Sequence, residues 1–154
     1  MEKIDLRPEH VQEISRDIAQ EISHLDTGLE AWKSIVQFGR GFSGVENGDV
    51  YVCSGILPVW TGRWILWGAV SNKTGPRQML WIHRRALEWL DGLQQSSPKE
   101  FRRIEATARM DEPQAIKWLE MLGFWREGVL LCYDAAGNDH IQYARISCHL
   151  TPHR

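Results

Sequence analysis

Two side chains in regularly patterned stretches of the sequence could move protons. Glu105 falls inside 103–108, where apolar and polar residues alternate as in a strand. A strand carboxylate that points into a cleft could act as a general base, directly or through a water molecule. The alternative for Glu105 is a salt bridge to Arg103, Arg109 or a helix arginine. His83 lies in a helical pattern and could be a base or a packed core histidine.

Other chemistries find no supporting motif. The sequence contains no nucleophile elbow and no phosphate-binding P-loop, and His149 and His153 are too sparse to indicate a metal site. Cys53, Cys132 and Cys148 are odd in number and have no CxxC spacing, which argues against a disulfide framework or a zinc site. We expect all three to be small buried side chains in a reducing compartment.

Composition and charge describe an ordinary globular protein. The chain has 154 residues and a formal net charge of −2, so a single domain over 1–154 is predicted, with no nucleic acid partner and no anionic membrane partner. The first residues lack the apolar core of a signal peptide. No apolar run approaches the roughly 20 residues needed to span a bilayer, so a cytoplasmic location is predicted.

Eight tryptophans are unusual for this length. Trp60, Trp64, Trp67 and Trp81 are concentrated in one region. Large aromatic side chains most often pack in a core, but they also line pockets or anchor a partner surface. Base stacking is disfavoured because the sequence has no basic groove.

The elements that must position these residues follow from periodicity and turn signals. The first half predicts a helix over 7–23 and a second helix that begins at Leu29 and ends near Gly39 and Gly41. Strands over 42–45 and 50–58 follow, joined by an Asn47-Gly48 hairpin turn. After a turn at 60–62, a strand over 63–70 is apolar on both faces, as in a central covered strand. The second half predicts a turn at 71–75, a helix from Pro76 to Gly92 and a linker-like stretch at 94–100. A strand over 103–108 and a helix over 112–122, stopped by Gly123, come next. The last predicted element is a hairpin of 124–133 with 140–146.

One segment in the second half matches a known family. Residues 112–124, EPQAIKWLEMLGF, resemble the segment N-x-x-A-x-x-L-Y-E-K-L-G-F of the GNAT superfamily of acyl-CoA N-acyltransferases. The matching positions are Ala115, Glu120, Leu122, Gly123 and Phe124. The order of predicted elements is also similar to that fold, with its first strand either missing or held in residues 2–6.

Within the superfamily, the sequence looks like small GNAT-like proteins of tailed phages and prophages. The stretches that carry this similarity are LRPEHVQEI, DVYVCSGILPVWTGRWILWGAVSN, RRIEATARMDEP and MLGFWREGVLLCYDAAGNDHIQYAR. The resemblance implies an α/β (α+β) GNAT-like fold, with a central mixed twisted sheet of about six to seven strands flanked by about four helices. It also implies acetyl-CoA or another acyl-CoA as the cofactor.

The resemblance further implies where such a cofactor binds. In the family, phosphates are held at the turn after the central strand and at the following helix N-terminus. That region is 71–80 here, where the family's later glycines are replaced and Pro76 removes one N–H donor. A backbone N–H near the end of the central strand polarises the thioester carbonyl. The implied cofactor-binding residues are Ala69, Val70, Lys73, Arg77, Gln78, Met79 and Leu80.

The proton-transfer residues are less well matched. The family's frequent tyrosine acid corresponds to Leu119, and its helix-opening asparagine corresponds to Glu112. Tyr133 could replace the tyrosine, although hairpin packing is the alternative, and Glu105 is the candidate base.

Three hypotheses remain open on the sequence. The first is an acetyl-CoA-dependent N-acetyltransferase that is encoded by a phage and acts on an amine, with a protein amine among the candidate acceptors. The second is a GNAT-like protein without catalysis that binds a host or virion protein, and the third is a structural component of the virion. A homodimer is compatible with each of them.

Overall fold

The computed structural model describes residues 1–17 and 29–149. Seven strands form one mixed sheet in the order β1-β2-β3-β4-β5-β7-β6, and four α-helices accompany it. The strands are β1 (Glu2–Asp5), β2 (Arg40–Glu46), β3 (Asp49–Trp60), β4 (Arg63–Val70), β5 (Arg103–Arg109), β6 (Trp125–Leu130) and β7 (His140–Ile146). The helices are α1 (Pro8–Asp17), α2 (Leu29–Phe38), α3 (Pro76–Ser96) and α4 (Pro113–Met121).

The chain divides into two compact units. Unit 1 comprises Met1–Pro58 and Leu66–Ala86, and unit 2 comprises Val59–Ile65 and Leu87–Arg154. The division passes through β4 and through α3, so each of these elements contributes to both units.

The first strands of unit 1 form an antiparallel meander. β1 pairs with β2, which places the first strand of the family's fold at Glu2–Asp5, within the residues 2–6 that the sequence left open. β2 and β3 form the hairpin predicted at Asn47-Gly48. Both turn residues have positive φ, 53° and 86°, as the tight two-residue turn requires.

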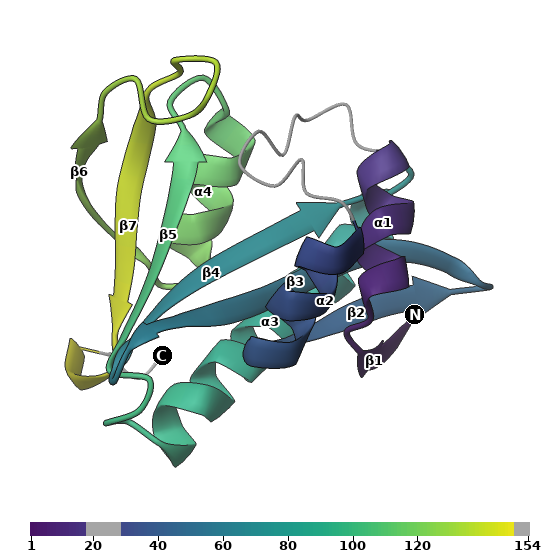
Figure 1. Ribbon diagram of the computed structural model, residues 1–154, viewed down its shortest axis with the longest axis horizontal. Helices are drawn as coiled ribbons and strands as arrows, with labels where there is room; N and C mark the ends of the chain where they lie inside the picture. The colour runs from purple at the N-terminus through teal and green to yellow at the C-terminus, as the bar shows by residue number, and fades with distance from the viewer. Residues whose placement is uncertain (18–28, 150–154) are drawn as a thin grey trace. The chain divides into compact units, whose positions relative to one another are not determined.

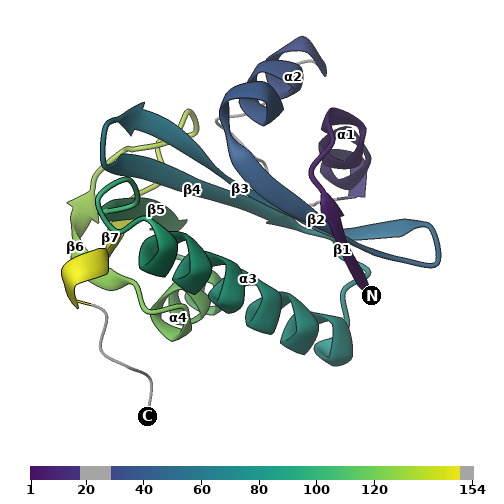
Figure 2. The same cartoon turned by 90° about the horizontal axis from the view of Figure 1, so that it is seen from below.

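Helices cover both faces of these strands in unit 1. The core cluster of Val11, Ile14, Val50, Cys53 and Ala69 joins α1 to one face. Trp81 of α3 lies against the other face, because a Cβ added at Gly44 would stand 2.8 Å from its ring. Figure 2 shows α1 and α2 on one side of β2 and β3, and α3 on the other.

Unit 2 contains the start of β4 and the remaining strands of the sheet. β5 pairs in parallel with the start of β4 and in antiparallel fashion with β7, which in turn pairs with β6 (Figure 1). The buried apolar side chains of β5 are Ile104, Ala106 and Ala108, at the alternate positions that the sequence predicted. Glu105, which lies between two of them, is also buried.

A buried arginine ties the elements of unit 2 together. Arg145 on β7 is fully buried and donates to the Leu122 carbonyl at the end of α4, over 3.0 Å. It also donates to Gln94 Oε1 over 2.6 Å and forms an ion pair with Asp91, both on α3. Gln94 Nε2 in turn donates to the Phe101 and Arg145 carbonyls. Because these hydrogen bonds and the ion pair compensate the buried guanidinium, Arg145 can hold α3 and α4 to β7.

This network corrects two expectations for α3. The helix does not end at Gly92 but continues to Ser96, and Gln94 is a buried helical residue, not part of a linker. The interactions of Asp91 and Gln94 with Arg145 hold the last turns in place. Tertiary contacts thereby outweigh the weak helix propensity of glycine.

Other boundaries differ by a few residues. The first predicted helix, 7–23, is helical from Pro8 to Asp17, and its predicted continuation lies outside the described residues. The expectation that β4 is covered on both faces is wrong for Ile65, which is 42% exposed. β4 is nevertheless central, between β3 and β5.

Candidate functional site

At the end of β4, one edge of the strand backbone faces β3 and the other edge faces the opposite direction. The Ser71 N–H donates to the Tyr51 carbonyl of β3 over 2.9 Å. Successive N–H groups of a strand point to alternate edges. The Ala69 N–H therefore also faces β3, whereas the Val70 N–H points to the opposite edge. The parallel pairing of β4 with β5 involves Arg63–Ile65, upstream of this position.

The turn after β4 is held in place by its own hydrogen bonds. The Thr74 N–H donates to the Ser71 carbonyl over 3.0 Å, and the Lys73 N–H donates to the Ser71 hydroxyl oxygen over 3.2 Å. The buried Ser71 and the Thr74 hydroxyl, 3.4 Å from the Tyr51 carbonyl, anchor the turn to β3. The turn thus leads directly from the end of β4 into α3.

The N-terminus of α3 begins at Pro76, as the sequence predicted. The first intrahelical bond runs from the Met79 N–H to the Gly75 carbonyl over 2.9 Å. The N–H groups of Arg77 and Gln78 therefore belong to the first turn, where a helix has no internal partners for them. A Cβ at Gly75 would meet only Gln78 Oε1, at 3.2 Å, so little lies over the backbone here.

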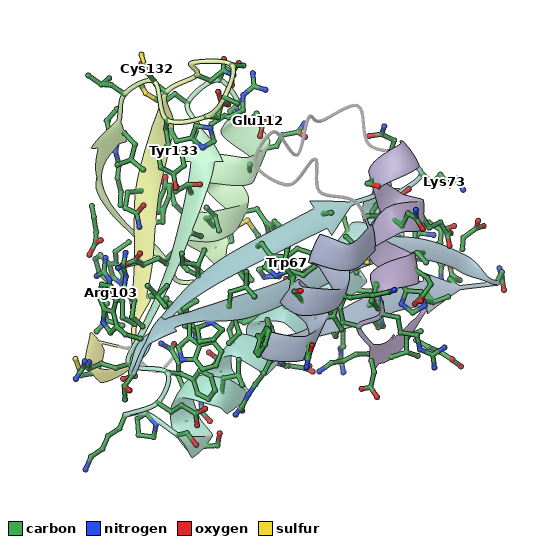
Figure 3. The ribbon with its side chains drawn as sticks, viewed as in Figure 1. Trp67, Lys73, Arg103, Glu112, Cys132 and Tyr133 are labelled. Carbon is green, nitrogen blue, oxygen red and sulfur yellow. The ribbon has the colours of Figure 1, made fainter. Side chains whose placement is uncertain are left out.

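Both cations predicted for phosphate binding face carboxylates of the β2–β3 hairpin. Lys73 Nζ lies 3.3 Å from Asp49 Oδ1. Arg77 Nη2 lies 2.9 and 2.8 Å from the two oxygens of Glu46, although 74% of its side chain is exposed. Gln78 Nε2 donates to the same carboxylate over 3.1 Å. Figure 3 shows Lys73 beyond the arrowhead that ends β4.

Glu46 is consequently a strongly perturbed carboxylic acid. Its carboxylate accepts hydrogen bonds from the Met1 ammonium, from Gln78 and from Arg77. These interactions lower the pKa of Glu46 from 4.5 to about 2. The hairpin therefore places stable negative charge beside the turn.

The candidate base Glu105 lies in unit 2 and is held by two arginines. Arg63 donates from Nε and Nη2 to its two oxygens over 2.8 and 2.7 Å, and Arg103 donates from Nε. Burial alone would raise the pKa of Glu105, but the hydrogen bonds from Arg63 and Arg103 outweigh it and lower the pKa. This environment favours the salt-bridge interpretation over proton transfer, because a carboxylate stabilised in its charged form is a weak base.

The candidate acid Tyr133 lies after β6, in the connection to β7, and is exposed. Its ring centroid lies 5.0 Å from that of His140, and its N–H donates to the Asn138 carbonyl over 2.9 Å. His140 pairs with Arg109 at the end of β5, four residues or about 13 Å along the strand from Glu105. The structure therefore does not bring the two predicted catalytic residues together.

The position of the family's tyrosine is filled by a packed side chain. Leu119 on α4 is buried, so its position supplies no proton donor. The neighbouring Glu120 accepts a hydrogen bond from the buried Tyr143 hydroxyl over 3.1 Å. Burial and the proximity of Glu120 raise the pKa of Tyr143. That pair fastens α4 to β7.

All seven predicted cofactor-binding residues fall in unit 1, within 69–80 at the end of β4, the turn and the start of α3. Glu46 and Asp49 are partners of this segment that no local sequence pattern indicates. The Asn47-Gly48 signal correctly predicts that Glu46 and Asp49 flank a hairpin turn. Only the pairing of β3 with its neighbours brings them to the turn, and no local pattern encodes that pairing.

The structure shows the environment of the three cysteines. Cys53 is buried, and burial raises its pKa to about 12, but Cys132 and Cys148 are exposed, contrary to expectation. No group of three or more His, Cys, Asp or Glu side chains that could hold a metal occurs in the described ranges. Among the helices that could be searched, none is long and apolar enough to cross a bilayer.

Sequence comparisons find no matching family model and no similar curated protein. Comparison with solved structures, in contrast, finds acetyltransferases of similar fold. The ribosomal-protein-S18-alanine N-acetyltransferase of Escherichia coli matches with a TM-score of 0.75 at 15% identity, covering 99% of this chain and 97% of that one.

Two further acetyltransferase structures match over almost their full length. A chimera of the Vibrio cholerae spermidine N-acetyltransferase SpeG and hSSAT has a TM-score of 0.74 at 10% identity, covering 96% of this chain and 95% of that one. A GNAT-family acetyltransferase of Streptococcus pneumoniae has a TM-score of 0.72 at 12% identity, covering 94% and 97%. With its seven-stranded mixed sheet and four helices, the chain therefore has the GNAT acetyltransferase fold.

Proposed function

We propose that this protein is an N-acyltransferase that transfers an acyl group from acyl-CoA to an amine. The observation that carries the proposal is the arrangement in unit 1, where the end of β4, the turn and the start of α3 follow one another without interruption. In a GNAT fold this is the segment expected to meet the cofactor. Acyl-CoA would supply the activated acyl group.

The start of α3 is suited to hold the cofactor's phosphates. The N–H groups of Arg77 and Gln78 lie in its first turn, where the helix dipole favours an anion. Gly75 leaves the backbone accessible, while Pro76 contributes no donor. We assign Lys73 and Arg77 as the cations of the site, with the half-buried Met79 and the exposed Leu80 flanking it.

The end of β4 is suited to orient the acyl group. Of the two candidates Ala69 and Val70, we assign the carbonyl-polarising N–H to Val70, because the N–H of Ala69 faces β3. A fixed backbone N–H lowers the cost of negative charge on a carbonyl oxygen.

Proton transfer is assigned to Tyr133 as the acid, because Leu119 fills the family's position and Glu105 is held in two ion pairs. A tyrosine hydroxyl can protonate a thiolate leaving group. Replacing Tyr133 with Phe should slow acetyl transfer to an amine while leaving the affinity for acetyl-CoA unchanged. An unchanged rate would remove Tyr133 from the mechanism.

We infer that the hairpin carboxylates compete with phosphate for the same cations. Glu46 is bonded to Arg77 and Gln78, and Asp49 to Lys73. An anionic ligand must therefore either displace these carboxylates or bind beside them. Removing the charge of Glu46 should strengthen binding, whereas reversing the charge of Arg77 should weaken it.

Calorimetric titration with acetyl-CoA tests this pair of opposite effects. We expect one site of roughly micromolar affinity in the natural chain, roughly tenfold weaker binding for Arg77→Glu, and several-fold tighter binding for Glu46→Gln. Arg84→Glu, an exposed change further along α3, is the matched control and should leave affinity unchanged. At a hundredfold excess over Kd, the ligand should stabilise the fold by about 2.7 kcal/mol. No binding by the natural chain at millimolar ligand would refute the proposal.

A second candidate function has its own supporting observation. Leu119 is buried in place of the family's tyrosine, and Trp60 and Trp125 are exposed. These features suit a phage-encoded GNAT-like protein that binds a host or virion protein without catalysis, in the host cytoplasm or in the virion. Acetyl-CoA binding coupled to acetyl transfer would exclude this candidate, and absence from purified virions by mass spectrometry would exclude the virion role.

A further inference from the structure

The tip of the β2–β3 hairpin carries an asparagine followed by a glycine. Asn47 and Gly48 form the two-residue turn between the paired residues Glu46 and Asp49, and both turn residues are exposed. In Figure 2 this turn projects at the right, beyond α1. A Cβ added at Gly48 would meet nothing within 4 Å, so the space around the Asn47–Gly48 peptide is open.

This dipeptide can modify itself without an enzyme. The backbone nitrogen of Gly48 can attack Cγ, the side-chain carbonyl carbon of Asn47. A bond forms between that nitrogen and Cγ, the Cγ–Nδ2 bond breaks, and Nδ2 leaves as ammonia with the proton of the Gly48 N–H. Water then opens the resulting succinimide ring. Opening at Cγ gives aspartate, whereas opening at the backbone carbonyl of residue 47 gives isoaspartate, whose main chain runs through the β-carbon.

The hairpin turn meets the requirements of this attack. The hydrogen bond that closes a two-residue turn uses the N–H of its fourth residue, here Asp49, so the Gly48 N–H lies outside the strand ladder. Gly48 has no side chain to obstruct its nitrogen. The backbone must rotate from the turn conformation, with φ of 53° and 86°, before the nitrogen reaches Cγ of Asn47. Local opening of this kind costs least at an exposed loop tip.

The other two asparagines of the chain do not combine these features. Asn138 donates from Nδ2 to both oxygens of Asp134, over 3.1 and 2.9 Å, and from its own N–H over 2.8 Å. These bonds hold the side chain and its leaving nitrogen in place. The residues that follow, Lys73 after Asn72 and Asp139 after Asn138, carry side chains that hinder the attack. The hairpin asparagine should therefore react first.

We propose that Asn47 is a site of spontaneous deamidation and isomerisation, and that the product weakens anion binding at the turn after β4. Either product adds a carboxylate one residue from Glu46, which bonds Arg77. Asp49, which contacts Lys73, is two residues away on the other side. Charges this close are only partly screened by physiological salt, so the added carboxylate opposes phosphate at both cations.

Isoaspartate has a second effect on the hairpin. It lengthens the turn by one carbon, which changes the spacing of the Glu46 and Asp49 carboxylates that flank it. The effect on ligand binding rests on the proposed acyl-CoA site, whereas the modification itself does not. The two parts of the proposal therefore have separate measurements.

Trypsin separates the three asparagines, so each serves as a control for the others. Cleavage after lysine and arginine places Asn47 in peptide 41–63, Asn72 in peptide 64–73 and Asn138 in peptide 127–145. The folded natural chain is kept in mildly alkaline buffer, which accelerates succinimide formation, and is sampled over days. Mass spectrometry measures deamidation in each peptide, and isoaspartyl methyltransferase labels isoaspartate. We expect peptide 41–63 to acquire both marks well before the other two peptides do.

Acetyl-CoA titration of fresh protein, aged protein and two variants tests the consequence for binding. Asn47→Asp adds the charge at once and should raise Kd several-fold, because like charge then faces the phosphates. Asn47→Gln, the matched control, forms the corresponding ring far more slowly and should keep its Kd on ageing. The Kd of the natural chain should rise toward that of Asn47→Asp, and circular dichroism checks that each variant is folded.

The outcomes separate this inference from the proposed function. Deamidation of peptide 41–63 no faster than that of the other two peptides would overturn the modification site. A Kd of Asn47→Asp equal to that of the fresh natural chain would overturn its effect on binding. If the fresh natural chain binds no acetyl-CoA while peptide 41–63 still deamidates first, the proposed function fails and the modification site stands.

Discussion

Glu46 places a negative charge beside the candidate cofactor turn, although it lies 31 residues before Arg77 in the sequence. Its pKa is lowered to about 2 by the Met1 ammonium, Gln78 and Arg77. A lowered pKa in the folded state means that the charged carboxylate stabilises the fold. This stabilisation is fully present above the ordinary pKa of 4.5 and is lost as pH falls toward 2.

We therefore expect Glu46→Gln to lower Tm near neutral pH by an amount that shrinks below about pH 4.5 and disappears near pH 2. Thermal melts followed by circular dichroism at a series of pH values measure the difference. A Tm difference that is the same at every pH would contradict the assigned interactions.

At the scale of elements, α3 continues through a glycine. Gly92 lies inside a 21-residue helix, and a Cβ at this position would meet nothing within 4 Å. Gly92→Ala should therefore stabilise the protein by about 0.5–1 kcal/mol, because alanine loses less backbone entropy on folding. Urea denaturation measures the free energy of unfolding.

Gly48 supplies a matched comparison for the Gly92 prediction. A Cβ there would also meet nothing, but φ is 86°. Gly48→Ala should destabilise by about 1 kcal/mol, since an L side chain is strained in that conformation. Equal changes in the free energy of unfolding for Gly92→Ala and Gly48→Ala would show that the backbone φ does not determine the effect.

Arg145 connects three elements of unit 2. Arg145→Met removes the charge but leaves the Leu122 carbonyl, Gln94 and Asp91 without their buried donor. We expect a loss of about 3 kcal/mol in the free energy of unfolding, measured in urea. The control Arg84→Met, on the exposed face of α3, should change the free energy of unfolding little. A similarly small effect of Arg145→Met would mean that the network does not stabilise the fold.

At the scale of the whole molecule, the proposed cofactor links stability to ligand concentration. If acetyl-CoA binds only the folded chain, it stabilises the folded state, so Tm should rise with acetyl-CoA concentration. Differential scanning calorimetry over a hundredfold range of ligand measures this rise, and Arg77→Glu should reduce it. A Tm of the natural chain that does not change with acetyl-CoA would argue against binding.

Much of the secondary structure could be predicted from sequence alone because its signals are local. Pro76 marks the start of α3, Asn47-Gly48 marks a hairpin, and Gly123 follows α4 with a φ of 82°. The 112–124 segment carried the family resemblance and hence the expected sheet, and the fold of the solved acetyltransferases confirms that expectation. The end of α3 was missed because Arg145, 51 residues after Gln94, holds it.

Local sequence patterns predict the order and type of most elements. The resemblance to the GNAT superfamily implies the fold and the candidate cofactor segment at 69–80. Which charges meet depends on the folded chain. Glu46 and Asp49 reach Arg77 and Lys73 through the order of the strands, and Glu105 pairs with Arg63 across β4 and β5. Periodicity reports which face a residue occupies within its own element. The partner on a distant strand depends on sheet order and register, which arise only when the whole chain packs.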